Sequence, residues 1–203
     1  MSPWLEAVGA SAGAVCVWLA AVSDAWTWPI GIGNNLLYLV VFWRSKLYAD
    51  ALLQLVYVGI SLYGIWRWRG GGGRVRPVER GRPLELALVA TAVAVSTLVL
   101  WRVLAGATDS DVPGWDALTT SMSLGAQWLM SRRILENWHL WIAVDVVYVP
   151  LFVYKQLYVT AGLYAFFMAL CLLGLRDWRR ELAASAAAAT IESPAAVDAV
   201  EGC

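Results

Sequence analysis

The chain has 203 residues, of which 60% are hydrophobic and only 15% are charged, and its formal net charge is zero. Soluble domains carry about 25% charged residues, so most of this chain is not suited to water. A neutral chain also lacks the basic bias of nucleic-acid-binding proteins, so no nucleic-acid partner is expected. We therefore predict an all-α integral membrane protein in a lipid bilayer, with room for about seven spans of roughly 20 residues.

Seven apolar segments follow one another along the chain. They begin near Trp4, Pro29, Tyr48, Leu84, Trp115, Trp138 and Leu157. The first is expected to be a retained span, because no basic stretch precedes it as in a cleaved signal peptide. The arginine-, glycine- and proline-rich segment 67–83 is predicted to be a loop. Residues 181–203 are rich in alanine and are predicted to form a disordered cytoplasmic tail.

Two of the spans, Pro29–Trp43 and Trp115–Met130, are short for a full crossing and rich in glycine or polar residues. Irregular spans are tolerated only where protein or a water-filled cavity satisfies the backbone. Both are therefore expected to lie beside a pathway for solutes.

The sequence repeats itself at an offset of 110 residues without a gap. The matching pairs are Trp28 and Trp138, Ile32 and Ile142, Tyr38 and Tyr148, Phe42 and Phe152, Leu47 and Leu157, Tyr48 and Tyr158, Gly64 and Gly174, and Trp68 and Trp178. Duplicated helix bundles are typical of secondary transporters, which hold substrate near the midplane between the copies. A repeat of three spans ends on the opposite side of the membrane from where it began, so a second copy placed directly after it would be inserted upside down. One additional span between the copies gives both the same orientation. The predicted transmembrane domain, 1–180, is thus a 3+1+3 arrangement of parallel repeats (4–69 and 115–179) joined by a linker helix (84–104).

Basic residues predict the orientation of the chain in the membrane. Eleven of the 15 fall on the side that receives the loop after span three, the loop after span five and the end of span seven. This asymmetry places the N-terminus outside and the C-terminus in the cytoplasm.

The second repeat carries one stripe of polar and aromatic residues. At 100° per residue, Trp138, Trp141, Asp145 and Tyr148 fall within about 80° of one helix face. An aspartate at membrane depth marks a function or a partner by default, and neighbouring indoles suit a flat cationic ring. The alternative for the aromatic residues is an interfacial belt. That alternative is favoured for the tryptophans at span ends: Trp4, Trp26, Trp43, Trp68 and Trp178.

The first repeat retains Trp28 and Tyr38 but has Asn35 where the second has Asp145. A ligand between the repeats would therefore meet an asymmetric pocket. Gln54 belongs to a further polar cluster together with Lys46 and Asp50. Lys46 and Asp50 have the i,i+4 spacing of an ion pair on a helix. Such a pair could have the purely structural role of sealing that end of the span.

No catalytic, metal or cofactor site is expected. The three cysteines are far apart and His139 is the single histidine, which argues against a His/Cys metal cluster. His139 is predicted to be an interface residue, and Glu136 to form a surface pair with Arg132 or Arg133. An enzyme is therefore disfavoured, since no nucleophile has a base beside it.

These motifs resemble those of the bacterial nicotinamide riboside transporter family of the PnuC type. The resemblance covers residues from about Trp28 to Trp178 without the linker helix. Three segments carry it: 46–50 with Gln54 and Tyr57; 127–129; and 136–138 with Trp141, Asp145 and Tyr148.

The resemblance implies a fold similar to that of the SWEET sugar transporters. It implies a multi-pass protein of the bacterial inner membrane. It also implies a facilitator that takes up nicotinamide riboside without its own energy source, coupled to a cytoplasmic kinase that traps the product. It also implies a ligand-contacting set: Gln127, Asn137, Trp138, Trp141 and Tyr148. Sister groups transport thiamine, riboflavin or other nucleosides, which leaves the identity of the vitamin open. A homo-oligomer is left open as well.

Overall fold

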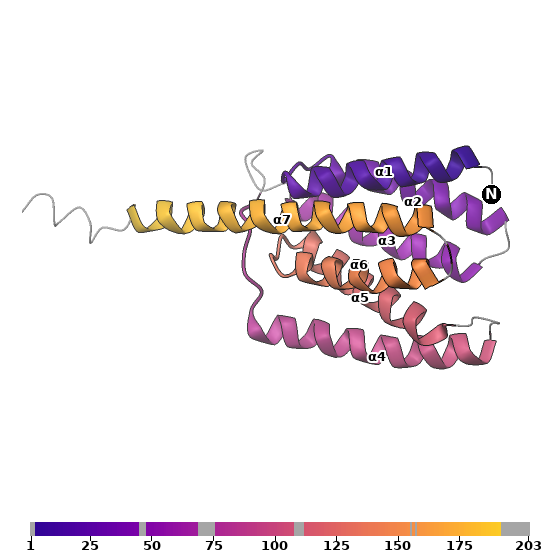
Figure 1. Ribbon diagram of the computed structural model, residues 1–203. Coiled ribbons are helices and arrows are strands. Elements are labelled where there is room, and N and C mark those ends of the chain that lie inside the picture. The colour runs from indigo at the N-terminus through magenta and orange to yellow at the C-terminus, as the bar shows by residue number, and fades with distance from the viewer. Residues whose placement is uncertain are drawn as a thin grey trace, which may run out of the picture.

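The computed structural model describes residues 3–44, 48–68, 76–107, 112–154, 156 and 158–191. Within these ranges the chain forms seven α-helices and one isolated parallel bridge, so the predicted all-α class is confirmed. The helices are α1 (Pro3–Ala21), α2 (Thr27–Arg44), α3 (Tyr48–Trp68), α4 (Pro83–Ala107), α5 (Pro113–Ser131), α6 (Asn137–Tyr154) and α7 (Tyr158–Ile191). They lie side by side along a common direction, with α4 on one flank and the end of α7 projecting beyond the bundle (Figure 1).

The predicted tail is wrong in its first half. Helix α7 continues to Ile191, so residues 181–191 are helical rather than disordered. Alanine has the highest helix propensity of the amino acids, which allows a helix to continue past the bundle. Residues 192–203 lie outside the described part of the chain, as do Lys46, the side chain of Asp50 and most of the arginine-rich loop.

The outer surface of the bundle is apolar. Helix α4 has no buried residue, and Leu84 and Leu88 are 73% and 62% exposed. Exposed apolar surface of this extent marks an interaction with lipid or protein. Among the described residues, two segments, Pro83–Ala107 and Thr160–Ala188, are long and apolar enough to cross a membrane.

Helices α1 and α5 end in the same way, 110 residues apart. Ser23 and Arg133 both take left-handed backbone conformations, with φ of 60° and 58°. The N–H of each bonds back to the carbonyl three residues earlier, and the next N–H bonds to the carbonyl five residues earlier. This is the Schellman motif, which ends a helix by satisfying its last carbonyls. The sequence repeat is therefore matched by a repeat in backbone geometry.

The tryptophans of the repeat also pack in equivalent pairs. The Trp28 and Trp68 rings meet edge to face at 5.3 Å and 87°, and the Trp138 and Trp178 rings do so at 5.4 Å and 85°. All four side chains are buried. The expectation that Trp68 and Trp178 form an interfacial belt is therefore wrong, because their rings pack inside the bundle. Trp26 and Trp43 are exposed, as a belt requires.

Helix contacts follow the same relation. Helix α2 packs between α1 and α3, and α6 packs between α5 and α7. Across the seam, α1 contacts α7 and α3 contacts α5, so the first helix of each half meets the third helix of the other. Helix α4 packs against α5, outside this pattern.

Gly64 and Gly174 should be required for the tryptophan pairs. A Cβ atom would lie 2.7 Å from the Trp28 ring at Gly64 and 2.5 Å from the Trp138 ring at Gly174. Alanine at either position should lower the free energy of unfolding by about 1–3 kcal/mol, the usual effect of overpacking. Thermal unfolding of the purified protein in detergent measures this effect.

Gly59 and Gly162 provide matched controls on the same two helices. A Cβ there meets nothing within 4 Å, so alanine should be neutral or slightly stabilising through its helix propensity. Equal unfolding temperatures for Gly64→Ala and Gly59→Ala would contradict the packing argument.

Candidate functional site

A cavity of about 560 Å³ lies between the two halves of the bundle. Its lining comes from α1, α2, α3, α5, α6 and α7, while no described residue of α4 takes part. Ligand sites in proteins typically have volumes of about 300–1,000 Å³ and occur between the helices of bundles. The cavity therefore has the size and place of a site for a small molecule.

The cavity brings together eight of the ten residues predicted to contact a ligand. These eight are Trp28, Asn35, Gln54, Gln127, Trp138, Trp141, Asp145 and Tyr148. The stripe predicted on one face of the helix after Asn137 thus faces a common space. Both repeats contribute to the lining, as the asymmetric-pocket hypothesis requires.

Asn137 and Tyr38 do not line this cavity. The side chain of Asn137 is fully buried, and its Nδ2 donates to the carbonyl of Ile134 at 2.7 Å. It stands at the first residue of α6, where it stabilises the turn that leads into the helix. Tyr38 lies about one helical turn beyond Asn34 and Asn35, the last residues of α2 in the lining.

Among the described residues that line the cavity, Asp145 alone has an acidic or basic side chain. Its side chain is buried, and the Cys171 thiol donates a weak hydrogen bond to Oδ2 at 3.7 Å. No lysine or arginine is among these lining residues to balance a bound phosphate, which proteins usually recognise with such groups. The site therefore favours a cationic or neutral ligand.

Several buried polar atoms of the lining residues have no hydrogen-bond partner within the described chain. They are the indole nitrogens of Trp28, Trp138 and Trp141 and the amide oxygen of Asn34. Buried polar groups in proteins are nearly always paired, so each unpaired one needs a partner such as water or a ligand. Three N–H donors and one acceptor on residues that line the cavity therefore have unused hydrogen-bonding capacity.

Sequence reasoning missed part of the lining. Asn34, Thr120, Ser123 and Cys171 line the cavity but were not predicted as site residues. Ser123 lies one turn before Gln127, so the helical period would have found it. Cys171 gave no such signal, because a cysteine in an apolar helix usually acts as a small hydrophobe.

Glu136 was predicted to form a surface pair with Arg132 or Arg133, but the structure gives these residues other partners. Glu136 accepts a hydrogen bond from the backbone N–H of Gly81 at 2.9 Å, and Arg132 pairs with Glu85 at 3.0 Å. His139 is exposed, with its ring 3.3 Å from the guanidinium of Arg179.

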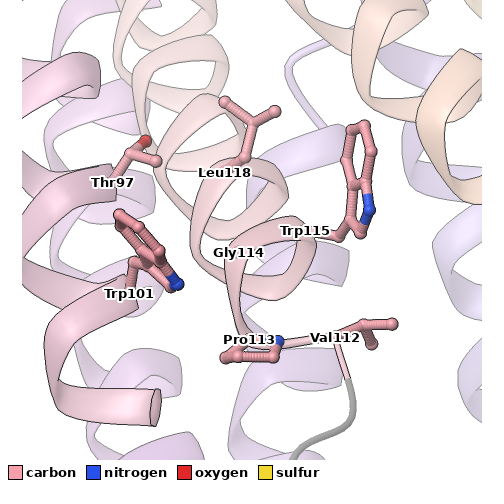
Figure 2. Close-up of a pocket in the computed structure, with 7 residues that line it drawn as sticks. All are labelled: Thr97, Trp101, Val112, Pro113, Gly114, Trp115 and Leu118. Carbon is pink, nitrogen blue, oxygen red and sulfur yellow. The ribbon is translucent and has the colours of Figure 1, made fainter.

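A second hollow of about 540 Å³ lies on the outer surface between α4 and the start of α5. Figure 2 shows Trp101 and Trp115 on either side of the turn that carries Pro113 and Gly114. It is apolar and has none of the convergent polar groups that fix a ligand. The inner cavity is therefore the candidate site.

A helical bundle with an apolar exterior and a central polar and aromatic cavity defines the class of small-molecule membrane transporters. Comparison with known proteins agrees. The family model described as "Nicotinamide mononucleotide transporter" matches residues 3–180, and the chain belongs to this family. The resemblance found in the sequence motifs is thereby confirmed.

Three proteins illustrate the relationship. The nicotinamide riboside transporter PnuC of Escherichia coli is 27% identical over 202 residues, which cover 86% of this chain and 84% of the relative. The riboflavin/roseoflavin transporter RibM of Streptomyces davaonensis is 28% identical over 185 residues, with the same coverage. A crystal structure of the vitamin B3 transporter PnuC superimposes with a TM-score of 0.68 and 27% identity, covering 88% of this chain and 82% of that one.

The position of Asn137 predicts a structural role. Replacing Asn137 with alanine leaves the Ile134 carbonyl without its side-chain donor inside the bundle. The carbonyl still accepts the backbone N–H of residue 137, at 3.1 Å in the parent protein. We therefore expect stability to fall by about 0.5–1.5 kcal/mol, the usual net contribution of one hydrogen bond. Thermal unfolding should show this loss, while calorimetry on the folded fraction should show a nearly unchanged dissociation constant. A large loss of affinity with unchanged stability would contradict this role.

Proposed function

We propose that the protein is a facilitator that takes up nicotinamide riboside through the cavity between its two halves. The observation that carries this proposal is the chemistry of the lining, with tryptophans, amides and one carboxylate but no basic side chain among its described residues. Nicotinamide riboside has a flat cationic ring, an amide and ribose hydroxyls, and no phosphate. Each of these groups has a complement in the lining. The E. coli relative named above supports the same substrate.

The proposed binding mode uses three kinds of contact. The pyridinium ring stacks on Trp141, next to the buried Trp138, because aromatic faces attract cations. Asp145 supplies negative charge, and Gln127 or Asn35 bonds the carboxamide. Gln54, Trp28 and Tyr148 complete the lining around the ribose.

The architecture proposed for transport is a 3+1+3 arrangement of parallel repeats, α1–α3 and α5–α7, with α4 as the linker. The equivalent helix ends, tryptophan pairs and seam contacts support it. Movement of one repeat against the other around a fixed site would alternate access. The basic residues favour an external N-terminus and a cytoplasmic C-terminus. The bacterial relatives favour an inner-membrane location. In this proposal a cytoplasmic kinase traps the riboside by phosphorylation.

An inside-negative potential favours entry of a +1 solute by about 2.3 kcal/mol per 100 mV. A separate coupling ion is therefore unnecessary for uptake. Uptake into proteoliposomes should persist when proton and sodium gradients are removed at fixed voltage. Loss of uptake under those conditions would contradict a facilitator.

Riboflavin is a second candidate substrate, because the Streptomyces relative is described as a riboflavin/roseoflavin transporter and is equally similar. The indoles of the cavity would also stack on a flavin ring. Thiamine, another ring-bearing vitamin, stays open as well. Competition by riboflavin and by thiamine against uptake of labelled riboside separates these candidates.

Trp141 should carry the stacking contact. Trp141→Ala should weaken riboside binding about tenfold or more, since a desolvated cation–π contact contributes about 2 kcal/mol. Trp141→Phe should retain part of the affinity because it keeps an aromatic face. Isothermal calorimetry measures both, with Trp101→Ala as the control, because Trp101 lies on α4 outside the cavity lining. Unchanged affinity in Trp141→Ala would refute the stacking role.

Asp145 should discriminate by charge. Asp145→Asn should weaken binding of the cationic riboside more than binding of its reduced form, which has no ring charge. Nicotinamide mononucleotide should compete poorly, because its phosphate meets no basic residue in the described lining. Equal losses for both riboside forms would argue against an electrostatic role of Asp145.

A further inference from the structure

One end of the cavity is closed by a layer of two tryptophans. Ala20 and Met130 line the cavity, and their carbonyls accept hydrogen bonds from the indole nitrogens of Trp178 and Trp68, each at 3.0 Å. The two indole rings lie 5.9 Å apart and are both fully buried. Each donor belongs to the half opposite its acceptor, so this layer closes the seam between the halves.

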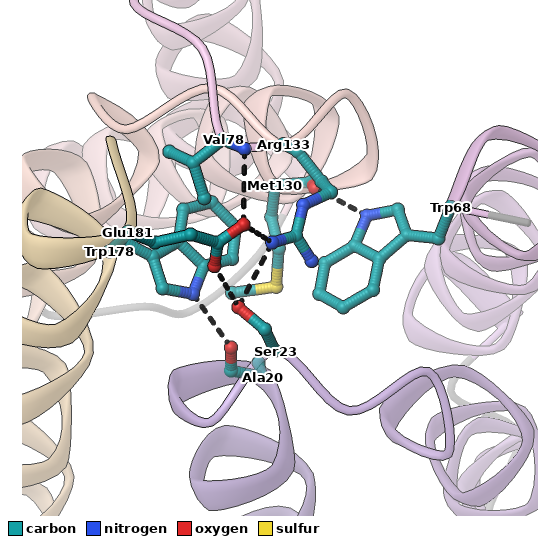
Figure 3. Close-up of polar contacts among 8 residues, drawn as sticks. All are labelled: Ala20, Ser23, Trp68, Val78, Met130, Arg133, Trp178 and Glu181. Carbon is teal, nitrogen blue, oxygen red and sulfur yellow. Dashed lines mark hydrogen bonds and ion pairs between the residues drawn. The ribbon is translucent and has the colours of Figure 1, made fainter. Parts of the chain in front are cut away.

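Arg133 lies against this layer. Its guanidinium carbon is 4.6 Å from the ring centre of Trp68 and 5.1 Å from that of Trp178. Its Nη2 pairs with Oε1 of Glu181 at 2.6 Å and donates to Oγ of Ser23 at 3.0 Å. The Ser23 hydroxyl donates in turn to Oε2 of Glu181 at 2.8 Å. Figure 3 shows the guanidinium between the two indoles, with Glu181 and Ser23 beside it.

The chain segment before α4 is tied to the same cluster. The backbone N–H of Val78 donates to Glu181 at 3.3 Å. Glu79 exchanges backbone hydrogen bonds with the turn of Arg133, through the Arg133 carbonyl at 3.0 Å and the Leu135 N–H at 2.9 Å. The cluster therefore joins the first half, the second half and the connection between them.

The backbone of Arg133 indicates that its side chain matters. A left-handed residue after a helix end is usually glycine, because other L-residues pay roughly 1–2 kcal/mol there. Arg133 keeps a long charged side chain at φ 58° and is 1% exposed. Burial lowers the pKa of its guanidinium, and the charge of Glu181 opposes that shift. Arginine remains a cation in proteins, so the cluster holds a charge pair.

Some hydrogen-bond donors next to the tryptophan layer have no acceptor within the described ranges. Nε and Nη1 of Arg133 have no hydrogen-bond partner in the part of the chain that the structure describes. Buried ion pairs contribute little net stability, because desolvation offsets the attraction between the charges. The side chain of Glu181 is already 32% exposed, so parting the layer would mainly return the buried guanidinium of Arg133 to water. That hydration offsets part of the free energy needed for opening. Two arrangements of similar free energy are what a switching element requires.

We propose that Arg133, Glu181, Trp68 and Trp178 form a gate that closes the cavity at the end carrying the arginine-rich connections. This inference rests on the proposed transport by alternating access. The gate is closed in this structure and parts when the cavity opens at that end. The basic residues place that end at the cytoplasm.

Native cysteines allow a direct test without substrate. Cys16 and Cys171 line the cavity, so in a Cys203→Ser background their modification reports access to it. The full-length protein in vesicles, its orientation fixed by tag accessibility, is treated from each side with a membrane-impermeant, positively charged thiol reagent. Glu181→Gln and Arg133→Gly should each speed modification from the C-terminal side about fivefold or more, the effect of roughly 1 kcal/mol. Because no substrate is used, failure here is distinct from failure of the proposed function.

Arg133→Gly tests the gate with little risk to the fold, because glycine is the preferred residue at that backbone position. Arg132→Gln is the matched control, since Arg132 lies in the same turn but pairs with Glu85, outside the cluster. Its modification rate should equal that of the parent protein. The double variant Arg133→Gly with Glu181→Gln should be no faster than the faster single variant. Unchanged rates in both single variants, or equal increases from both sides, would overturn the gate.

Discussion

The structure depends on hydrogen bonds that cross between its two halves. The indole N–H of Trp68 bonds to the carbonyl of Met130, and that of Trp178 bonds to the carbonyl of Ala20. Each acceptor lies at the end of the first helix of a half, and each also accepts the backbone N–H of the left-handed residue that ends the helix, Ser23 or Arg133. The same bonds close one end of the cavity, so fold and site share one set of contacts.

The two repeats have similar backbones but carry different residues at some equivalent positions, and these differences make the site asymmetric. Asn35 and Asp145 occupy equivalent positions in the cavity but differ in charge. Ser23 and Arg133 occupy equivalent turns, but only the arginine reaches both tryptophans of the closing layer. The difference between Asn35 and Asp145 would orient an asymmetric ligand in the cavity. The difference between Ser23 and Arg133 places a charged residue at one end of the cavity.

Much of the site could be predicted because helical period and the internal repeat are local properties. Trp138, Trp141, Asp145 and Tyr148 were placed together from their spacing alone, and the structure lines one cavity with them. Asn137 has the same neighbours in sequence but begins a helix, so its amide serves the backbone instead. Tyr38 matches Tyr148 in the repeat yet lies beyond the lining, because the cavity is not symmetric.

The sequence by itself determined the helical class, the repeat and the polar face of the second half, because residue spacing on a helix fixes which side chains share a face. Only the tertiary structure decided that Trp68 and Trp178 are internal, that Glu181 belongs to a helix, and that it pairs with Arg133. These contacts join residues separated by 48 to 158 positions. Their partners are set by how the two halves meet, and that packing is not encoded in any local pattern.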